Sequence, residues 1–177
     1  MKHFKILILY ASHGGATKYC AELLAEQLGS IHEICVTDIE KQPPTPSDFD
    51  VIVLASSIRM GKIDKTMKRY LKTHQEILST KKTAVALCCG LPRLFDEYIE
   101  TQLPQGLVCT LGHHLFGGEL KPEKLHGMDK FFVKIARHSI QTQDFEQSED
   151  NLHDLPELLP ENVALLADKI KQLALEE

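Results

Sequence analysis

LYASHGGATK, residues 9–18, joins an apolar segment to a helical one. The apolar segment is FKILILY, residues 4–10, which overlaps the start of this stretch. Almost all of its residues are apolar, which predicts a strand buried on both faces. Helical spacing of apolar residues begins at Thr17 and continues to Leu28, where Gly29 is expected to end the helix. Between them lies a short turn rich in hydroxyl groups and glycine, so this part of the chain is expected to form a strand-turn-helix unit.

The same alternation of apolar strands and amphipathic helices continues to the end of the chain. Further strands are expected over 34–39, 50–56, 83–89 and 107–117, and further helices over 63–78, 92–103, 127–139 and 158–173. Residues 141–154 are acidic and polar, which predicts a surface loop before the closing helix. This order predicts one α/β domain over residues 1–177, with a parallel sheet covered by helices on both faces.

Composition narrows the class of function. The chain has 177 residues and a net charge of −5, so no nucleic-acid partner is expected. Five cysteines without a framework-like spacing indicate reduced thiols, and nine scattered histidines predict no metal site. Neither a signal peptide nor a membrane span is apparent, so a cytoplasmic location is expected.

The turn after the first strand has the chemistry of an anion site. In an open parallel sheet, ligands bind beyond the carboxyl ends of the strands, and a helix N-terminus there presents unpaired N–H groups. Gly14 and Gly15 allow close backbone approach, while Ser12, His13 and Thr17 supply side-chain donors. A phosphate is therefore the expected ligand. The alternative is an ordinary helix cap without a ligand. A P-loop and a GxGxxG fingerprint are both absent.

Residues 10–17, YASHGGAT, resemble the FMN phosphate loop of flavodoxins, whose pattern is roughly Ser/Thr-x-Thr-Gly-x-Thr. Ser12, Gly15 and Thr17 match this pattern, whereas Gly14 and Ala16 replace residues that are usually polar. The resemblance implies a flavodoxin-like three-layer sandwich with FMN as cofactor. It also implies a five-stranded parallel sheet of order 2-1-3-4-5, with helices on both faces.

A second segment resembles one branch of this family, the menaquinone-dependent protoporphyrinogen dehydrogenases and related flavodoxin-domain proteins. The matching residues are Ser56, Ser57, Ile58, Arg59, Met60 and Gly61, and residues 116–139 are similar to a later segment of the same branch. The flavodoxin resemblance implies that this second loop and a third one, with Cys89, Gly90 and Leu91, line the flavin ring. Met60 stands where the resemblance implies an aromatic residue, and the chain has no tryptophan.

Three alternative functions are compatible with these resemblances and with the residues that depart from the family pattern. The first is an FMN-dependent oxidoreductase that oxidises a porphyrinogen or another small organic substrate and passes electrons to a quinone. The second is a flavodoxin-type electron carrier that docks on redox proteins and has no substrate of its own. The third is a flavin-free binding module. No catalytic acid or base is identified, and Arg59 fits either an anionic partner or a structural salt bridge.

The segment 128–140 combines aromatic and basic side chains. One interpretation is an interfacial helix that makes peripheral contact with the inner face of the membrane or with a quinone-bearing partner. The other is a surface helix that packs its apolar side on the sheet. The sequence leaves both open, and it does not predict the oligomeric state.

Overall fold

The computed structural model describes residues 2–118 and 158–176. Its strands are β1 (Lys5–Ala11), β2 (Glu33–Asp38), β3 (Val51–Arg59), β4 (Lys62–Ile63), β5 (Lys82–Cys88) and β6 (Gly112–Gly117). Its α-helices are α1 (Ala16–Leu28), α2 (Lys65–Thr73), α3 (Gln75–Thr80), α4 (Phe95–Gln102) and α6 (Pro160–Glu176). Short 3-10 turns cover Gly29–Ile31, Pro46–Asp48 and Pro92–Leu94. No helix in these two described ranges is both long and apolar enough to cross a bilayer.

Five parallel strands form the sheet in the order β2-β1-β3-β5-β6, and the two-residue β4 pairs antiparallel with β3. The predicted order 2-1-3-4-5 is confirmed, because β5 and β6 are the fourth and fifth of the parallel strands. The register places Ile8 of β1 beside Val36 of β2 and Val53 of β3. The carboxyl ends of β1, β3 and β5 therefore meet at one edge of the sheet.

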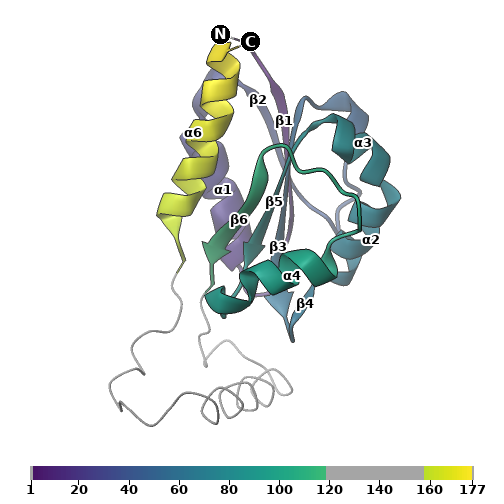
Figure 1. The fold of residues 1–177 in the computed structure, drawn as a ribbon. Helices are drawn as coiled ribbons and strands as arrows, with labels where there is room; N and C mark the ends of the chain where they lie inside the picture. Colours follow the sequence, from purple (N-terminus) through teal and green to yellow (C-terminus); the bar gives the residue numbers. More distant parts are fainter. Residues whose placement is uncertain (1, 119–157, 177) are drawn as a thin grey trace.

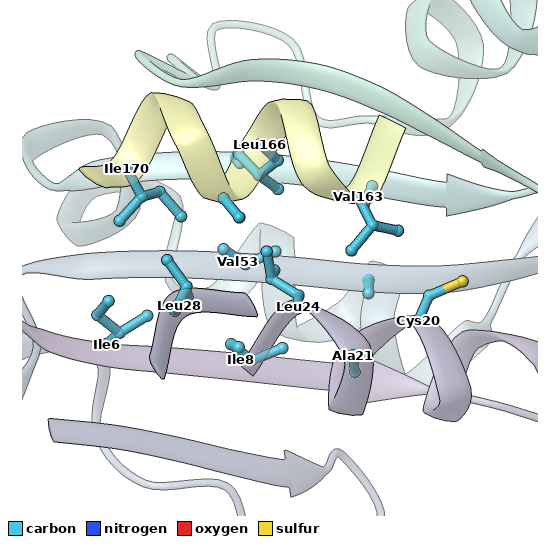
Figure 2. Close-up of a cluster of buried hydrophobic side chains, with 14 of the residues drawn as sticks. Ile6, Ile8, Cys20, Ala21, Leu24, Leu28, Val53, Val163, Leu166 and Ile170 are labelled. Carbon is cyan, nitrogen blue, oxygen red and sulfur yellow. The ribbon is translucent and has the colours of Figure 1, made fainter. Parts of the chain in front are cut away.

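Helices cover both faces of the sheet, as predicted (Figure 1). The helices α1 and α6 lie on one face, and α2, α3 and α4 lie on the other. Alternate residues of β1 supply the two cores: Ile6 and Ile8 point toward α1 and α6, whereas Leu7 and Leu9 point the other way. Figure 2 shows the first core, in which side chains of α1 and α6 meet those of the sheet.

The closing helix α6 is anchored where β6 ends. Leu158 pairs with Gly117, and the Leu159 N–H donates to the Phe116 carbonyl at 2.9 Å. The Asn162 side chain donates to the Leu115 carbonyl at 2.7 Å. Gly117 and Leu158, which lie far apart in sequence, are therefore neighbours at the carboxyl end of β6. The predicted helix 127–139, the predicted acidic loop 141–154 and the basic aromatic segment 128–140 lie outside the described residues.

The prediction of one helix over 63–78 is wrong. Ile63 belongs to β4, where it pairs with Ile58, and the helix starts only after Asp64. The Asp64 carboxylate accepts hydrogen bonds from the N–H groups of Thr66 and Met67, at 2.8 and 3.1 Å, and so fixes the start of α2. The backbone then leaves the helical region at His74, which separates α2 from α3.

The predicted strand 107–117 is shorter than expected and begins at Gly112. The residues before it form turns: the Leu107 N–H donates to the Pro104 carbonyl, and the Gly112 N–H donates to the Cys109 carbonyl. Gly112 has a φ of 85°, a left-handed conformation that few side chains tolerate. Apolar residues at 107 and 109 gave this turn the appearance of a strand.

His32 makes the stability of the fold depend on pH. Its ring is buried beside Phe4, and Nδ1 accepts the Phe4 N–H at 3.4 Å, which requires an unprotonated nitrogen. Burial, together with the nearby His3, lowers the pKa of His32 below its ordinary value of 6.5. The folded chain therefore binds fewer protons here than the unfolded chain, and the free energy of unfolding should fall as pH drops through about 6.5.

Urea unfolding at pH 7.5 and pH 5.5 would measure this effect. We expect a lower midpoint at pH 5.5, and a smaller pH difference in His32→Asn, which keeps an acceptor but does not titrate. An unchanged pH difference in His32→Asn would assign the effect to other groups.

Candidate functional site

The three predicted loops meet at the carboxyl edge of the sheet. Ala11, the last residue of β1, lies beside Ser56 of β3, and Ser56 lies beside Leu87 of β5. Segments 12–17, 56–61 and 89–91 consequently follow neighbouring strands at the same edge, the lower end of the sheet in Figure 1. The sequence grouped these residues correctly, although their local structure differs from the prediction.

The first segment forms an open helix N-terminus. Gly15 is the N-cap of α1, with a φ of 91° and no side chain to cap the helix. The Ser12 hydroxyl accepts the Gly15 N–H at 3.1 Å and shapes the turn. A Cβ built on Gly14 or Gly15 would meet no atom within 4 Å, so there is space in front of the turn. The N–H groups of Ala16 and Thr17 lie at the positive end of the helix dipole, which favours an anion.

Thr17 is the most informative residue of this turn. Its side chain is fully buried, and its hydroxyl oxygen makes no well-aligned hydrogen bond in the described structure, with the buried Cys88 thiol as a polar neighbour. A buried hydroxyl without a partner costs about 1–3 kcal/mol, so such groups are uncommon unless a ligand or water satisfies them. Of the two interpretations of the turn, this unsatisfied group favours an anion site over a plain cap.

The second predicted loop is instead a β-hairpin. Ser56, Ser57, Ile58 and Arg59 continue β3, so the strand is longer than the predicted 50–56, and only Met60 and Gly61 form the turn. Both turn residues have positive φ, 52° and 73°, and the hairpin closes through the pairs Ile58–Ile63 and Arg59–Lys62. The hairpin raises Met60 at its tip with 48% of its surface exposed. A non-glycine residue with positive φ is strained, and such strain is concentrated at functional sites.

A hydrogen-bond network joins the first segment to the hairpin. His13 Nε2 lies 2.9 Å from Asp64 Oδ2, while the other oxygen of Asp64 caps α2. The Asp64 N–H donates to Ser56 Oγ at 3.2 Å, and this hydroxyl donates to the Ser57 carbonyl. Ser57 Oγ is itself buried without a partner. His13 is therefore held by Asp64. Its Nε2 would have to leave Asp64 to donate a hydrogen bond to an anion, as the sequence predicts.

Asp64 was missed by the sequence reasoning. Its position just before a basic amphipathic helix is an N-cap signal that could have located it. Its pairing with His13, 51 residues away in sequence, has no local signal.

The third segment is a tight turn around Cys89. The Leu91 N–H donates to Cys89 Sγ at 3.3 Å, and the Cys89 thiol donates to the Leu91 carbonyl at 3.1 Å. Burial raises the pKa of the Cys89 thiol, opposed by the bond from Leu91. Cys89 is thus a protonated structural residue at neutral pH. Gly90 and Leu91 are half-buried, and Leu91 packs against the core on the α2 face.

Gly118 packs directly on this turn. A Cβ at position 118 would lie 2.8 Å from the Cys89 carbonyl carbon and 3.0 Å from its oxygen. Because backbone atoms cannot easily move aside, we expect Gly118→Ala to destabilise the fold by about 2 kcal/mol, measured by urea unfolding. Gly14→Ala is the control, since its Cβ enters open space without a positive φ. Equal stability of both variants would show that the Cys89 turn adapts freely.

Three other features of the described structure lie outside the candidate site or are absent from it. The described residues contain no group of three or more His, Cys, Asp or Glu side chains arranged to hold a metal ion. A surface hollow of about 680 Å³ lies at the α2–α3 junction, between residues such as His74, Gln75 and Gly106, and includes none of the predicted site residues. Cys20 and Cys88 are buried in the core beneath α1, and their mutual hydrogen bond and burial raise the pKa of Cys20.

Comparison with known proteins agrees with this geometry. The profile of the family described as "Flavodoxin domain" matches residues 7–148. A search of curated proteins finds no match. Among solved structures, oxidised flavodoxin 1 from Bacillus cereus aligns with a TM-score of 0.50 and 21% identity, covering 76% of this chain and 98% of that one. A Fusobacterium nucleatum flavodoxin bound to flavin mononucleotide aligns with a TM-score of 0.52 and 14% identity, covering 96% and 98%. The chain belongs to the flavodoxin domain family.

Proposed function

We propose that the carboxyl edge of the sheet binds FMN and that the protein is an FMN-dependent oxidoreductase. The observation that carries this proposal is the N-terminus of α1, which has no side-chain cap and holds the unsatisfied hydroxyl of Thr17. Membership of the flavodoxin domain family supports it, and the Fusobacterium nucleatum relative is described as bound to flavin mononucleotide.

The phosphate group of FMN would be held by the first segment. The backbone N–H groups of Ala16 and Thr17 and the hydroxyls of Ser12 and Thr17 would supply its donors, while the Gly15 N–H is bound to Ser12 Oγ. The departures at Gly14 and Ala16 remove side-chain donors, which shifts this task to the backbone. No atom lies within 4 Å of a Cβ built on Gly14 or Gly15, so no side chain blocks the approach of a ligand there.

The isoalloxazine ring would lie between the hairpin and the third segment. The Met60 thioether at the hairpin tip offers a polarisable contact, and Leu91 offers an apolar one on the other side. Ser57, in the part of β3 that enters the hairpin, has a buried hydroxyl without a partner. When bound, FMN supplies the transfer of electrons between an organic donor and an acceptor, while the protein positions and tunes it.

The residue at the hairpin tip favours an enzyme over an electron carrier in which the flavin ring is enclosed. Met60 is a flexible side chain that does not enclose a ring as an aromatic residue would, which leaves access for a small organic substrate. The finer proposal, oxidation of a porphyrinogen with a quinone as acceptor, is supported by the resemblance of residues 56–61 to the protoporphyrinogen dehydrogenase branch. No described residue is assigned as its acid or base.

A titration with two flavins tests the binding site. FMN and riboflavin differ only in the phosphate, so flavin fluorescence quenching should give a dissociation constant about 100-fold lower for FMN, the equivalent of two charge-assisted hydrogen bonds. Equal affinities would remove the phosphate site from the proposal, and no binding of either flavin would leave a flavin-free module.

The reaction class needs a separate experiment. Protoporphyrinogen added without oxygen to the FMN-loaded protein should bleach the 450 nm flavin band within seconds, and a soluble menaquinone analogue should then restore it. An unchanged band would reject the porphyrinogen proposal. Bleaching only by a flavoprotein reductase would favour the electron carrier.

A further inference from the structure

One side of the β4–α2 region is strongly basic. We define the α2 basic face as the exposed side chains of Lys62, Lys65, Lys68, Arg69 and Lys72. The helix α2 is amphipathic. Met67, Tyr70 and Leu71 are buried against the sheet, and the cations occupy the opposite side. Within residues 2–118 and 158–176, none of the five cations forms an ion pair.

Two acidic groups near this face are already engaged in hydrogen bonds. Asp64, the only carboxylate between residues 59 and 72, is bound to His13 and to the N-terminus of α2. Glu40 accepts a hydrogen bond from Thr66 Oγ1 at 2.9 Å. Lys68 Nζ also donates to Gln102 Oε1 of α4 at 3.4 Å, so it is mainly the other four cations of the α2 basic face that present their charge to an external partner.

The charge of this segment opposes that of the rest of the chain. Residues 59–72 contain six cations and one carboxylate, a net charge of +5, whereas the chain as a whole has −5 and its remainder −10. Exposed lysines that merely keep a protein soluble need not be gathered on one helix. A local field of this sign raises the encounter rate with anions even when the overall charge is negative.

We propose that the α2 basic face docks an acidic protein that exchanges electrons with the site at the carboxyl edge. The proposal rests on the proposed function, because β4 and the start of α2 directly follow the Met60 tip of the hairpin, which we place against the flavin. A partner bound along the α2 basic face would meet the site at its exposed end. Charge complementarity then sets the orientation of the complex and its rate of formation.

A compact acidic surface fits this face better than an anionic membrane does. A membrane is much larger than the basic face, and the net charge of −10 on the rest of the chain opposes its approach to an extended anionic surface. Membrane-binding helices also insert large apolar side chains, and among the described residues only Met60 is a large exposed apolar group next to this face.

The first test measures docking without any flavin. A fluorescein-labelled decaglutamate peptide is titrated with the apoprotein at 20 mM salt and followed by fluorescence anisotropy. The triple variant Lys65→Gln, Lys68→Gln, Lys72→Gln should bind about tenfold more weakly. A control with Lys5, Lys18 and Lys171 changed to Gln, which has the same net charge, should bind within about twofold of the unchanged protein.

Two results would overturn the docking proposal. One is equal loss of peptide binding in both triple variants, which would make the attraction a general charge effect. The other is binding to phosphatidylserine vesicles with no binding of the peptide, which would identify a membrane surface. Because the apoprotein is used, neither result depends on the proposed cofactor.

The second test links the face to electron exchange. The reduced FMN-loaded protein is mixed with ferricyanide, each ion of which accepts one electron to become ferrocyanide, so two oxidise one flavin. We expect the rate to fall about tenfold between 10 and 500 mM salt, and the α2 triple variant to lose most of this dependence. A rate that rises with salt would show a negative field at the site and contradict the proposal. Failure to retain FMN would instead reject the proposed function, whatever the peptide experiment shows.

Discussion

Replacing Gly15 by leucine is expected to weaken FMN binding at least about 100-fold. Gly15 has a φ of 91°, which strains any L-residue by roughly 1–2 kcal/mol, and its Cβ direction opens into the space proposed for the phosphate. The leucine side chain would occupy that space as well as shift the backbone donors. A fluorescence titration of the apoprotein with FMN measures the change.

Gly29 provides a matched control at the other end of the same helix. It also has a positive φ, 71°, and open space around its Cβ, but it lies far from the carboxyl edge. Gly29→Leu should therefore share the strain and destabilise the fold while leaving FMN affinity within about twofold. Thr17→Val, which keeps the shape and removes the hydroxyl, should weaken binding by about tenfold. Unchanged affinity in both Gly15→Leu and Thr17→Val would make the turn a plain helix cap.

Replacing Leu166 by alanine is expected to lower the free energy of unfolding by about 3 kcal/mol. Leu166 is completely buried in the core between α6, α1 and the sheet, as Figure 2 shows. Truncation removes buried methyl groups and leaves a cavity that neighbours such as Leu24 and Val163 cannot fill without moving. Urea unfolding followed by circular dichroism would measure the loss.

The adjacent residue supplies the control for this prediction. Leu165 precedes Leu166 on α6 but has 64% of its surface exposed, so Leu165→Ala should change stability by less than about 0.5 kcal/mol. A large effect of Leu165→Ala would mean that α6 has a partner on its outer side. A negligible effect of Leu166→Ala would contradict the packing of α6 against the sheet.

The sequence predicted the sheet well because its buried strands carry an unambiguous signal. Segments such as 4–10 and 83–89 are apolar without alternation, and each is followed within four residues by a glycine. The hairpin escaped prediction for the opposite reason. Residues 56–59 are mixed in polarity, and in the turn Met60 precedes Gly61, where Asn, Asp or Gly usually marks this conformation.

Part of the candidate site was equally predictable. Hydroxyls and glycines at the end of β1 indicate a helix N-terminus, which was predicted at Thr17 and lies one residue earlier, at Ala16 with Gly15 as its N-cap. The contacts that hold the loops of the site together could not be predicted in this way. His13 contacts Asp64, and Gly118 packs on Cys89, only after the chain has folded. Such pairs are set by sheet register and loop length, which local patterns do not encode.

The most direct test of the central claim is the visible absorption spectrum of the purified protein after incubation with FMN and removal of free flavin by desalting. We expect a band near 450 nm that stays with the protein and is released by denaturation as FMN. A colourless protein that does not retain added FMN would contradict the flavin site, and would leave the turn at Ser12 as a helix cap or a site for another anion.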